Sequence, residues 1–325
     1  MKAGGAAAVL LLGASTISAE PFATRDQNPL LAGFGLPSPL PARIEPRESD
    51  SARWSIAADL NWASTALVQT SARETLIVDA ESRELRIAVQ RSLSPQTALR
   101  IAAPWRYTGG GSLDSFIDDW HQWFDLPEGA RPALPRDRLR IAYARDQTTR
   151  LDSRYAGHGL GDVSIGVGHQ VLSTEPAALA AWLTLELPTG DADKFNGSGA
   201  VDASLALAGD ARLAQRWTAF AQAGVSWLGD GDIFPDLQRN VVWSALVGVG
   251  WRATPLIELK AQVDAHSAAF DSRLDFLGDS VAVTIGGALH LRSGWRVDIG
   301  VTEDIAVETA PDVVFILGLR RGSVR

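Results

Sequence analysis

The feature that most constrains this chain is a two-residue alternation of apolar and polar side chains, repeated in one segment after another. In residues 257–266, apolar side chains at the odd positions alternate with polar side chains at the even positions. Residues 281–291 and 297–302 alternate similarly. A period of two is typical of a β-strand with one apolar face, whereas a helix repeats about every 3.6 residues. Several such strands in succession predict an all-β antiparallel meander.

Tryptophan positions indicate which face of this sheet meets water. Three segments carry Trp at both ends of their apolar face, namely Trp54 and Trp62, Trp217 and Trp227, and Trp243 and Trp251. About ten residues at a rise of ~3.3 Å, tilted by ~40°, span about 25 Å, the height of the apolar band of an outer-membrane barrel. Trp favours both edges of such a band because its ring is apolar and its N–H needs a polar partner. A soluble barrel would place large rings mid-strand in its core, so the pattern favours a transmembrane β-barrel.

Short and long connections alternate between the predicted strands, as in bacterial barrels with short periplasmic turns and long extracellular loops. The long connections are residues 63–74, 104–161, 188–199, 228–240, 267–280 and 303–312. This spacing predicts about twelve strands within residues 54–320, with fourteen as the alternative. The predicted strands are 54–63, 75–91, 97–104, 162–171, 179–187, 200–208, 216–227, 241–251, 256–266, 280–291, 294–302 and 313–320. The second strand is overlong, which predicts a bulge or an extension beyond the membrane.

Residues 1–19 have the pattern of a secretory signal peptide, with Lys2, an apolar run from Ala3 to Leu12, and small residues up to Ala19. We therefore expect export, a periplasmic N-terminal segment over residues 20–53, and a location in the outer membrane of a Gram-negative bacterium. No later stretch is long and apolar enough for a transmembrane helix. The expected partners are outer-membrane lipid and, during biogenesis, the barrel-assembly machinery.

The composition argues against several classes of function. The 325 residues include no cysteine, which rules out a disulfide framework, a thiolate nucleophile and Cys-ligated zinc. The formal net charge of −8 disfavours a nucleic-acid partner, because neutralising phosphates requires a basic surface. The chain shows no nucleophile elbow, zinc-helix motif or phosphate-binding loop, so we predict no catalytic residues, no metal site and no cofactor.

The connection over residues 105–161 contains a predicted extracellular helix over residues 112–124. Its apolar side chains recur at helical spacing, at Leu113, Phe116, Ile117, Trp120, Trp123 and Phe124. One interpretation is an amphipathic helix that packs over or into the barrel mouth. The other is a gate, or an aromatic cradle for an apolar small-molecule ligand, with contacts from Phe116, Trp120, His121 and Trp123.

The polar face of the strands would line the lumen, and we expect Glu258, Lys260, Asp264 and Arg296 in its wall. Inward charges of both signs either pair across a filled barrel or line a wet pathway. The inward set is more acidic than basic, which favours cations over anions in any such pathway. The predicted function is a channel, transporter or binder of a small molecule.

Two other classes of function stay open. An outer-membrane lipid-modifying enzyme would need a base from among His121, His158, His169, His266 and His290, and none has an evident nucleophile beside it in the predicted strand pattern. A structural or adhesive barrel without conduction is the third alternative.

Several short runs of this chain are similar to a known family. They are Gln27-Asn28-Pro29-Leu30, Gly33-Phe34-Gly35-Leu36-Pro37, Gly110-Gly111-Ser112-Leu113-Asp114, Trp120-His121, Phe124-Asp125-Leu126-Pro127 and Gly159-Leu160-Gly161-Asp162. These runs resemble the uncharacterised proteobacterial outer-membrane family called domain of unknown function (DUF) 3187. The resemblance covers essentially the whole mature chain and implies a β-barrel envelope protein, with no known substrate or catalytic residues. The chain departs from the usual barrel ending, an aromatic residue, because it finishes on Arg325.

Overall fold

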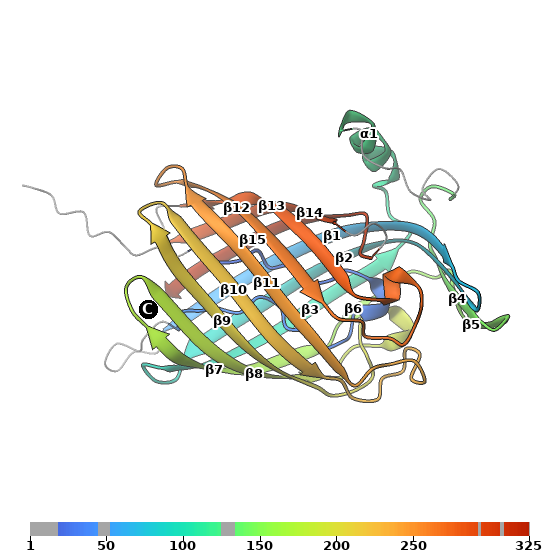
Figure 1. The fold of residues 1–325 in the computed structure, drawn as a ribbon, viewed down its shortest axis with the longest axis horizontal. Coiled ribbons are helices and arrows are strands. Elements are labelled where there is room, and N and C mark those ends of the chain that lie inside the picture. Colours follow the sequence, from blue (N-terminus) through green and yellow to red (C-terminus); the bar gives the residue numbers. More distant parts are fainter. Residues whose placement is uncertain (1–18, 45–52, 125–133, 292–293, 306–308, 325) are drawn as a thin grey trace, which may run out of the picture.

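Twelve antiparallel strands close into a barrel, seen from the side in Figure 1. The structure is a computed structural model and describes residues 19–44, 53–124, 134–291, 294–305 and 309–324. The barrel strands are β1 (Trp54–Thr70), β2 (Glu74–Ser92), β3 (Thr97–Gly109), β7 (Val163–Ser173), β8 (Ala177–Leu187), β9 (Asp202–Ala214), β10 (Trp217–Trp227), β11 (Val241–Arg252), β12 (Ile257–His266), β13 (Ser280–His290), β14 (Trp295–Asp304) and β15 (Val313–Val324). Neighbours in this series pair with each other, and β1 pairs with β15 to close the sheet. The predicted twelve-stranded meander is confirmed.

The apolar face of the strands points outward. Ile285, Val247 and Leu183 are 64%, 57% and 55% exposed, whereas Thr284 and Asp298 on the inner face are fully buried. A soluble barrel would show the reverse, because its apolar side chains would fill the interior. The fold is therefore that of an outer-membrane barrel, with its apolar surface turned toward lipid.

The two ends of the barrel differ in their connections. At what we call the short-turn end, connections of only a few residues join β2 to β3, β7 to β8, β9 to β10, β11 to β12 and β13 to β14. The remaining connections lie at the long-loop end, on the right of Figure 1. Trp217 stacks on Trp251 at the short-turn end, with 6.0 Å between ring centroids, and Trp227 and Trp243 lie at the other end of the same strand pair. Among the described residues, no helix has the length and hydropathy to cross a membrane.

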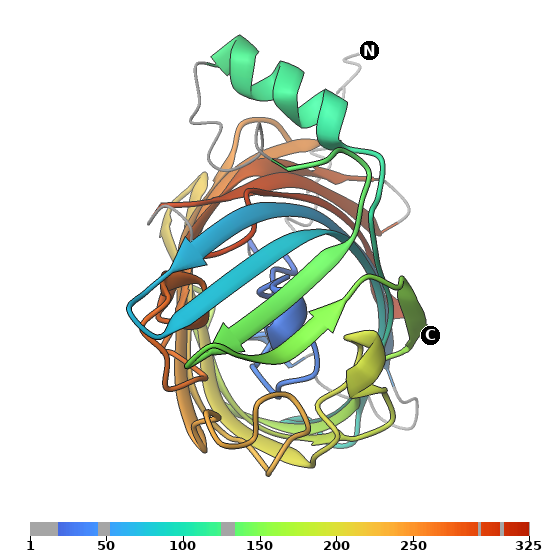
Figure 2. The same ribbon diagram turned by 90° about the vertical axis from the view of Figure 1, so that its right-hand side faces the viewer.

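The β1–β2 hairpin extends far beyond the other strands at the long-loop end. Its pairing runs without a register shift to Thr70 and Thr75, so the long loop expected over residues 63–74 is wrong and no bulge interrupts β2. The extension continues into β4 (Arg140–Arg145), which pairs with β2, and β5 (Thr148–Ser153), which pairs with β4. A further strand, β6 (Gly157–Leu160), pairs with β3. Figure 2 shows these strands crossing the mouth of the barrel.

Residues 19–44, which we call the lumen segment, lie inside the barrel. Figure 2 shows this segment and its short 3₁₀ helix η1 (Pro29–Leu31) surrounded by the wall. The expectation of a periplasmic segment over residues 20–53 is therefore wrong for residues 20–44. The physical reason is burial, since Phe22, Leu30 and Phe34 are at most 1% exposed and would be in water in a periplasmic linker.

An apolar cluster closes the long-loop end, and we call it the mouth cap. It joins the lumen segment, the β1–β2 extension and the loops after β10 and β12, with buried side chains that include Leu30, Leu31, Phe34, Leu67, Leu76, Val78, Ile141, Tyr143, Phe234, Phe270, Phe276 and Leu277. Ring contacts join the lumen segment to the loop after β12, with 5.3 Å between the centroids of Phe34 and Phe270, and join β4 to the loop after β10, with 4.6 Å between those of Tyr143 and Phe234. The overlong β1–β2 hairpin exists because its apolar positions are covered by this cap rather than by lipid.

Candidate functional site

The ascending limb of the lumen segment runs alongside β12 in constant register. Four polar contacts join residues that are 240 positions apart: Lys260 Nζ donates to Glu20 O at 3.0 Å, Phe22 N to Gln262 Oε1 at 2.9 Å, Thr24 Oγ1 to Asp264 Oδ1 at 2.8 Å, and His266 Nε2 lies 2.8 Å from Asp26 Oδ2. The inward polar side chains of β12 therefore guide the segment from the short-turn end to the long-loop end.

The segment turns at η1, beneath the mouth cap. The Asn28 side chain begins this helix by accepting a hydrogen bond from Leu30 N at 2.9 Å. Its amide nitrogen donates to Phe276 O, also at 2.9 Å, which ties the turn to the loop after β12. Leu30 and Leu31 insert into the cap. The turn is thus held from two sides, by polar contacts and by apolar burial.

The descending limb returns to the short-turn end along β7 to β10. Its contacts with the wall are Gly35 N to Asp202 Oδ2 at 2.7 Å, Leu40 N to Gln222 Oε1 at 2.8 Å, Trp182 Nε1 to Pro41 O at 2.9 Å, Ile44 N to Gln170 Oε1 at 2.6 Å, and Arg43 to Asp210 at 2.8 Å. Within the described residues, no part of the lumen segment forms a strand. Its buried backbone groups are satisfied by wall side chains instead of by sheet pairing.

A charged cluster surrounds the start of the ascending limb. Asp298 accepts from Lys260 Nζ at 2.5 Å and from Arg296 Nε at 3.0 Å. Glu20 lies 3.0 Å from Arg296 and 3.2 Å from Arg320. The first residues of the lumen segment therefore belong to the ionic network of the wall.

A second ionic cluster lies on β2 and β3. Glu84 accepts from Arg106 at 2.7 Å and from Arg86 at 3.3 Å, and all three side chains are almost fully buried. Arg25 of the lumen segment reaches Glu186 on β8 at 3.4 Å. Charges of both signs thus pair across the lumen and around the segment, as in filled barrels.

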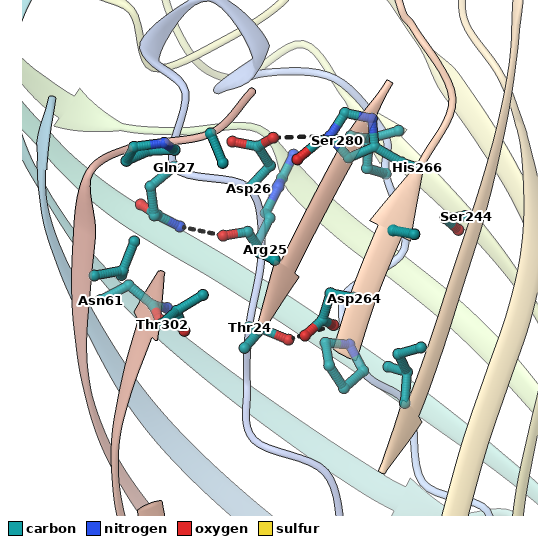
Figure 3. A pocket seen from close by; sticks show the side chains of 18 of the residues that line it. Thr24, Arg25, Asp26, Gln27, Asn61, Ser244, Asp264, His266, Ser280 and Thr302 are labelled. Carbon is teal, nitrogen blue, oxygen red and sulfur yellow. Dashed lines mark hydrogen bonds and ion pairs between the residues drawn. The ribbon is translucent and has the colours of Figure 1, made fainter. Parts of the chain in front are cut away.

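A cavity remains between the two limbs and the wall strands β11 to β15 (Figure 3). It contains about 790 Å³ of space not filled by atoms, part of which is open to solvent. Leu36, Leu246, Val314 and Ile316 give it apolar sides, while Asp264 and the Asp26–His266 pair give it polar ones. The side-chain oxygen of Asn61, Oδ1, lies beside it and is buried without a hydrogen-bond partner in the described structure. This cavity has the mixed lining that suits a small organic molecule.

The four residues predicted for the lumen wall all lie on the inner face, but in three different settings. Lys260 and Arg296 meet at Asp298 in the charged cluster. Asp264 lines the cavity and receives its hydrogen bonds from uncharged Thr24 and Gln262. Glu258 pairs with His290, 2.6 Å away, near the short-turn end.

Helix α1 (Asp114–Phe124) lies against the outer wall, not over or in the mouth as expected. Phe116 contacts Phe315 on β15, with 5.8 Å between ring centroids. Trp123 is 69% exposed. The side chains of Trp120 and His121 lie outside the described part of the structure. Phe116 and Trp123 are therefore separated from the lumen by the barrel wall.

The position of residues 19–44 inside the lumen is not predicted from the sequence. The runs around Asn28 and Phe34 resemble the family, but they carry no periodic pattern that places them in the lumen. A usable indication was present, because residues 22–36 contain more large apolar side chains than a solvated linker tolerates.

Comparison with known proteins supports the fold. The family whose model matches the chain is described as a protein of unknown function (DUF3187), and the match covers residues 7–322. No curated protein matches the chain. The COG4313 outer membrane channel from Pseudomonas putida F1 has a TM-score of 0.55 at 14% identity, over 86% of this chain and 99% of that one. The NanC porin has a TM-score of 0.47 at 8% identity, over 84% of this chain and 100% of that one. At 14% identity the likeness to the first concerns the fold alone.

Proposed function

This chain belongs to the DUF3187 family, and we propose that it is an outer-membrane channel for small molecules whose pathway is closed by its own lumen segment. The observation that carries the proposal is the way residues 19–44 are held. They fill the lumen as a separate loop, attached by side-chain hydrogen bonds and ion pairs rather than by strand pairing. Such contacts can be exchanged for water one at a time, without opening the sheet. The solved barrel with a similar fold is named as a channel, which makes conduction a reasonable starting point.

The path of the lumen segment gives the direction in which it would leave. Both of its ends lie at the short-turn end, where Glu20 meets Arg320 and Arg43 meets Asp210. Withdrawal toward that end needs no threading of the chain through the barrel. We place the short-turn end in the periplasm, since bacterial barrels have short periplasmic turns and long outer loops. Export by a signal peptide over residues 1–19 belongs to the same proposal.

The second candidate is a barrel that stays closed and has a structural role. The mouth cap favours it, because a continuous apolar cluster covers the long-loop end. The two candidates differ in one measurable property. A channel carries current across a planar bilayer in some state of the lumen segment, whereas a structural barrel carries none in any state.

The open pathway is expected to prefer cations. Among the charged groups that line the cavity, His266 pairs with Asp26 and Arg25 pairs with Glu186, while Asp264 is bound by uncharged donors. In a potassium chloride gradient, the zero-current potential should therefore have the sign of potassium selectivity. Asp264→Asn should move this potential toward zero. The control is Asp236→Asn, which removes the same charge from an exposed pair with Arg150.

Three results bear on the proposal. Current with cation selectivity that falls in the Asp264 variant supports it. Anion selectivity would contradict the assigned role of Asp264 and leave the channel itself supported. Absence of current, both in the full chain and in a folded variant without residues 20–44, would overturn the channel in favour of the structural barrel.

A further inference from the structure

Helix α1 packs on the side of the barrel that faces lipid. Ile117 is fully buried, in a cluster with Val313 and with the partly buried Trp62, Val301 and Phe315. Leu317 and Leu319 share the outward face of β15 with Phe315 and are 49% and 40% exposed. The helix therefore covers the outer surface of the barrel near the long-loop end. Closer to the short-turn end, the same surface is apolar and exposed.

A buried carboxylate fixes the start of the helix to this wall. Glu81 on β2 is 1% exposed and accepts hydrogen bonds from the backbone N–H groups of Ser112 and Leu113. Its second oxygen accepts from Trp62 Nε1 at 2.8 Å. The guanidinium of Arg83 lies over the Trp62 ring, 4.4 Å from its centroid. An acidic group at a helix N-terminus also complements the helix dipole. The attachment is thus a specific one.

This attachment sets the height of the helix along the barrel. Trp62 lies at the long-loop edge of the apolar face whose other edge is marked by Trp54, and α1 begins beside Trp62. In Figure 2, which looks along the barrel from its long-loop end, α1 lies across the barrel axis on the outside of the wall. A helix that lies beside the Trp62 edge of the apolar face and runs across the barrel axis is at the level of the boundary between acyl chains and headgroups.

We propose that α1 is an in-plane membrane anchor, whose apolar side chains enter the lipid leaflet on the long-loop side. Phe116 and Trp123 are large apolar residues left 41% and 69% exposed. Phe116 contacts Phe315 on the outward apolar face of the barrel, and Trp123, seven residues further on, lies on the same side of the helix as Phe116. The lipid that covers this face therefore reaches both side chains. An aromatic, amphipathic helix beside a membrane edge is a known interfacial element. The inference is independent of conduction, since it concerns the outer surface only.

The absence of cysteine in the chain permits a direct test with single labels on the full-length protein. Three variants, Trp123→Cys, Ile285→Cys and Thr148→Cys, each receive the same environment-sensitive fluorophore. Ile285 lies on the outward face of β13 and reports lipid, whereas the exposed Thr148 in β5 reports the region beyond the membrane. Each protein is folded into phosphatidylcholine vesicles whose acyl chains carry bromine, either close to the headgroup or close to the chain middle. Bromine quenches only fluorophores that it contacts.

The expected result is quenching at position 123 that reaches about half of that at position 285 or more, and that is stronger with bromine close to the headgroup. Quenching at position 123 equal to that at position 148 would overturn the proposal. Protection of position 123 by a second copy of the chain, seen as concentration-dependent crosslinking without quenching, would overturn it in favour of a dimer contact. Absence of quenching at both 123 and 285 would overturn the anchor together with the membrane placement of the barrel.

Discussion

A variant that lacks residues 20–44 is expected to carry about tenfold more current than the full chain, because a lumen that loses its filling becomes a water-filled path. The deletion removes both limbs, including the Glu20 contacts at one end. At the other end it takes Leu30, Leu31 and Phe34 out of the mouth cap. The measurement is single-channel recording in planar bilayers. Folding is checked by the shift in electrophoretic mobility between heated and unheated samples.

The matched control for this deletion is a variant without residues 112–124. These residues lie on the outer wall, so their removal should leave the current of the full chain unchanged. The opposite result would be a larger current after removal of residues 112–124 and an unchanged current after removal of residues 20–44. It would show that the helix, and not the lumen segment, closes the channel. It would restore the role that the sequence first suggested for Phe116 and its neighbours.

Replacing Asp298 by Asn is expected to lower the free energy of unfolding by about 3–5 kcal/mol, because it leaves buried cations without their shared anion. The Asp298 and Lys260 side chains are each 1% exposed, and Arg296 contacts the same carboxylate. An amide keeps the size of the side chain and two hydrogen-bonding atoms but removes the charge. Glu20 would partly compensate, since it also contacts Arg296.

Unfolding in urea, followed by the fluorescence of the 11 tryptophans in lipid vesicles, measures this effect. The control is Asp146→Asn, which breaks an exposed pair with Arg73 and should leave stability unchanged within error. Equal behaviour of the two variants would show that the cluster around Asp298 is solvated and not structural.

The barrel itself could be predicted from the sequence because its determinants are local and periodic. In β12 and β13 each side chain faces either lipid or lumen, and a period of two records that choice directly. The Trp residues at both ends of β10 and β11 mark the membrane edges in the same way. Strand ends were less predictable, since β1 and β2 continue under a cap made of distant segments.

The lumen segment could not be predicted because its partners are single side chains far away in the chain. Thr24 meets Asp264 across 240 positions, and no periodicity in residues 20–44 encodes that register. The period of two identifies the inward polar residues of β12, but it does not show whether water or protein provides their hydrogen-bond partners. The sequence therefore predicts that the four wall residues lie on the inner face of the barrel, but it does not predict the residues with which they interact.

The position of α1 illustrates a different limit. An amphipathic pattern shows that a helix buries one face, but it does not say against which surface. Here the decision depends on Glu81 and Trp62, two residues on neighbouring strands that hold the start of the helix outside the wall. No motif or spacing in the sequence indicates a role for Glu81.

The central claim is that residues 20–44 occupy the lumen, in register with β12. It is tested most directly by crosslinking in a double variant, Thr24→Cys with Asp264→Cys, where the two polar atoms of the native side chains lie 2.8 Å apart. The chain has no other cysteine, so any intramolecular disulfide joins these two positions. We expect this disulfide to form in the folded protein, as read by peptide mapping without reductant. We also expect Thr24→Cys with Lys260→Cys to stay reduced, since Lys260 lies beside Glu20 instead. Equal crosslinking of the two pairs, or crosslinking of neither, would contradict the claim.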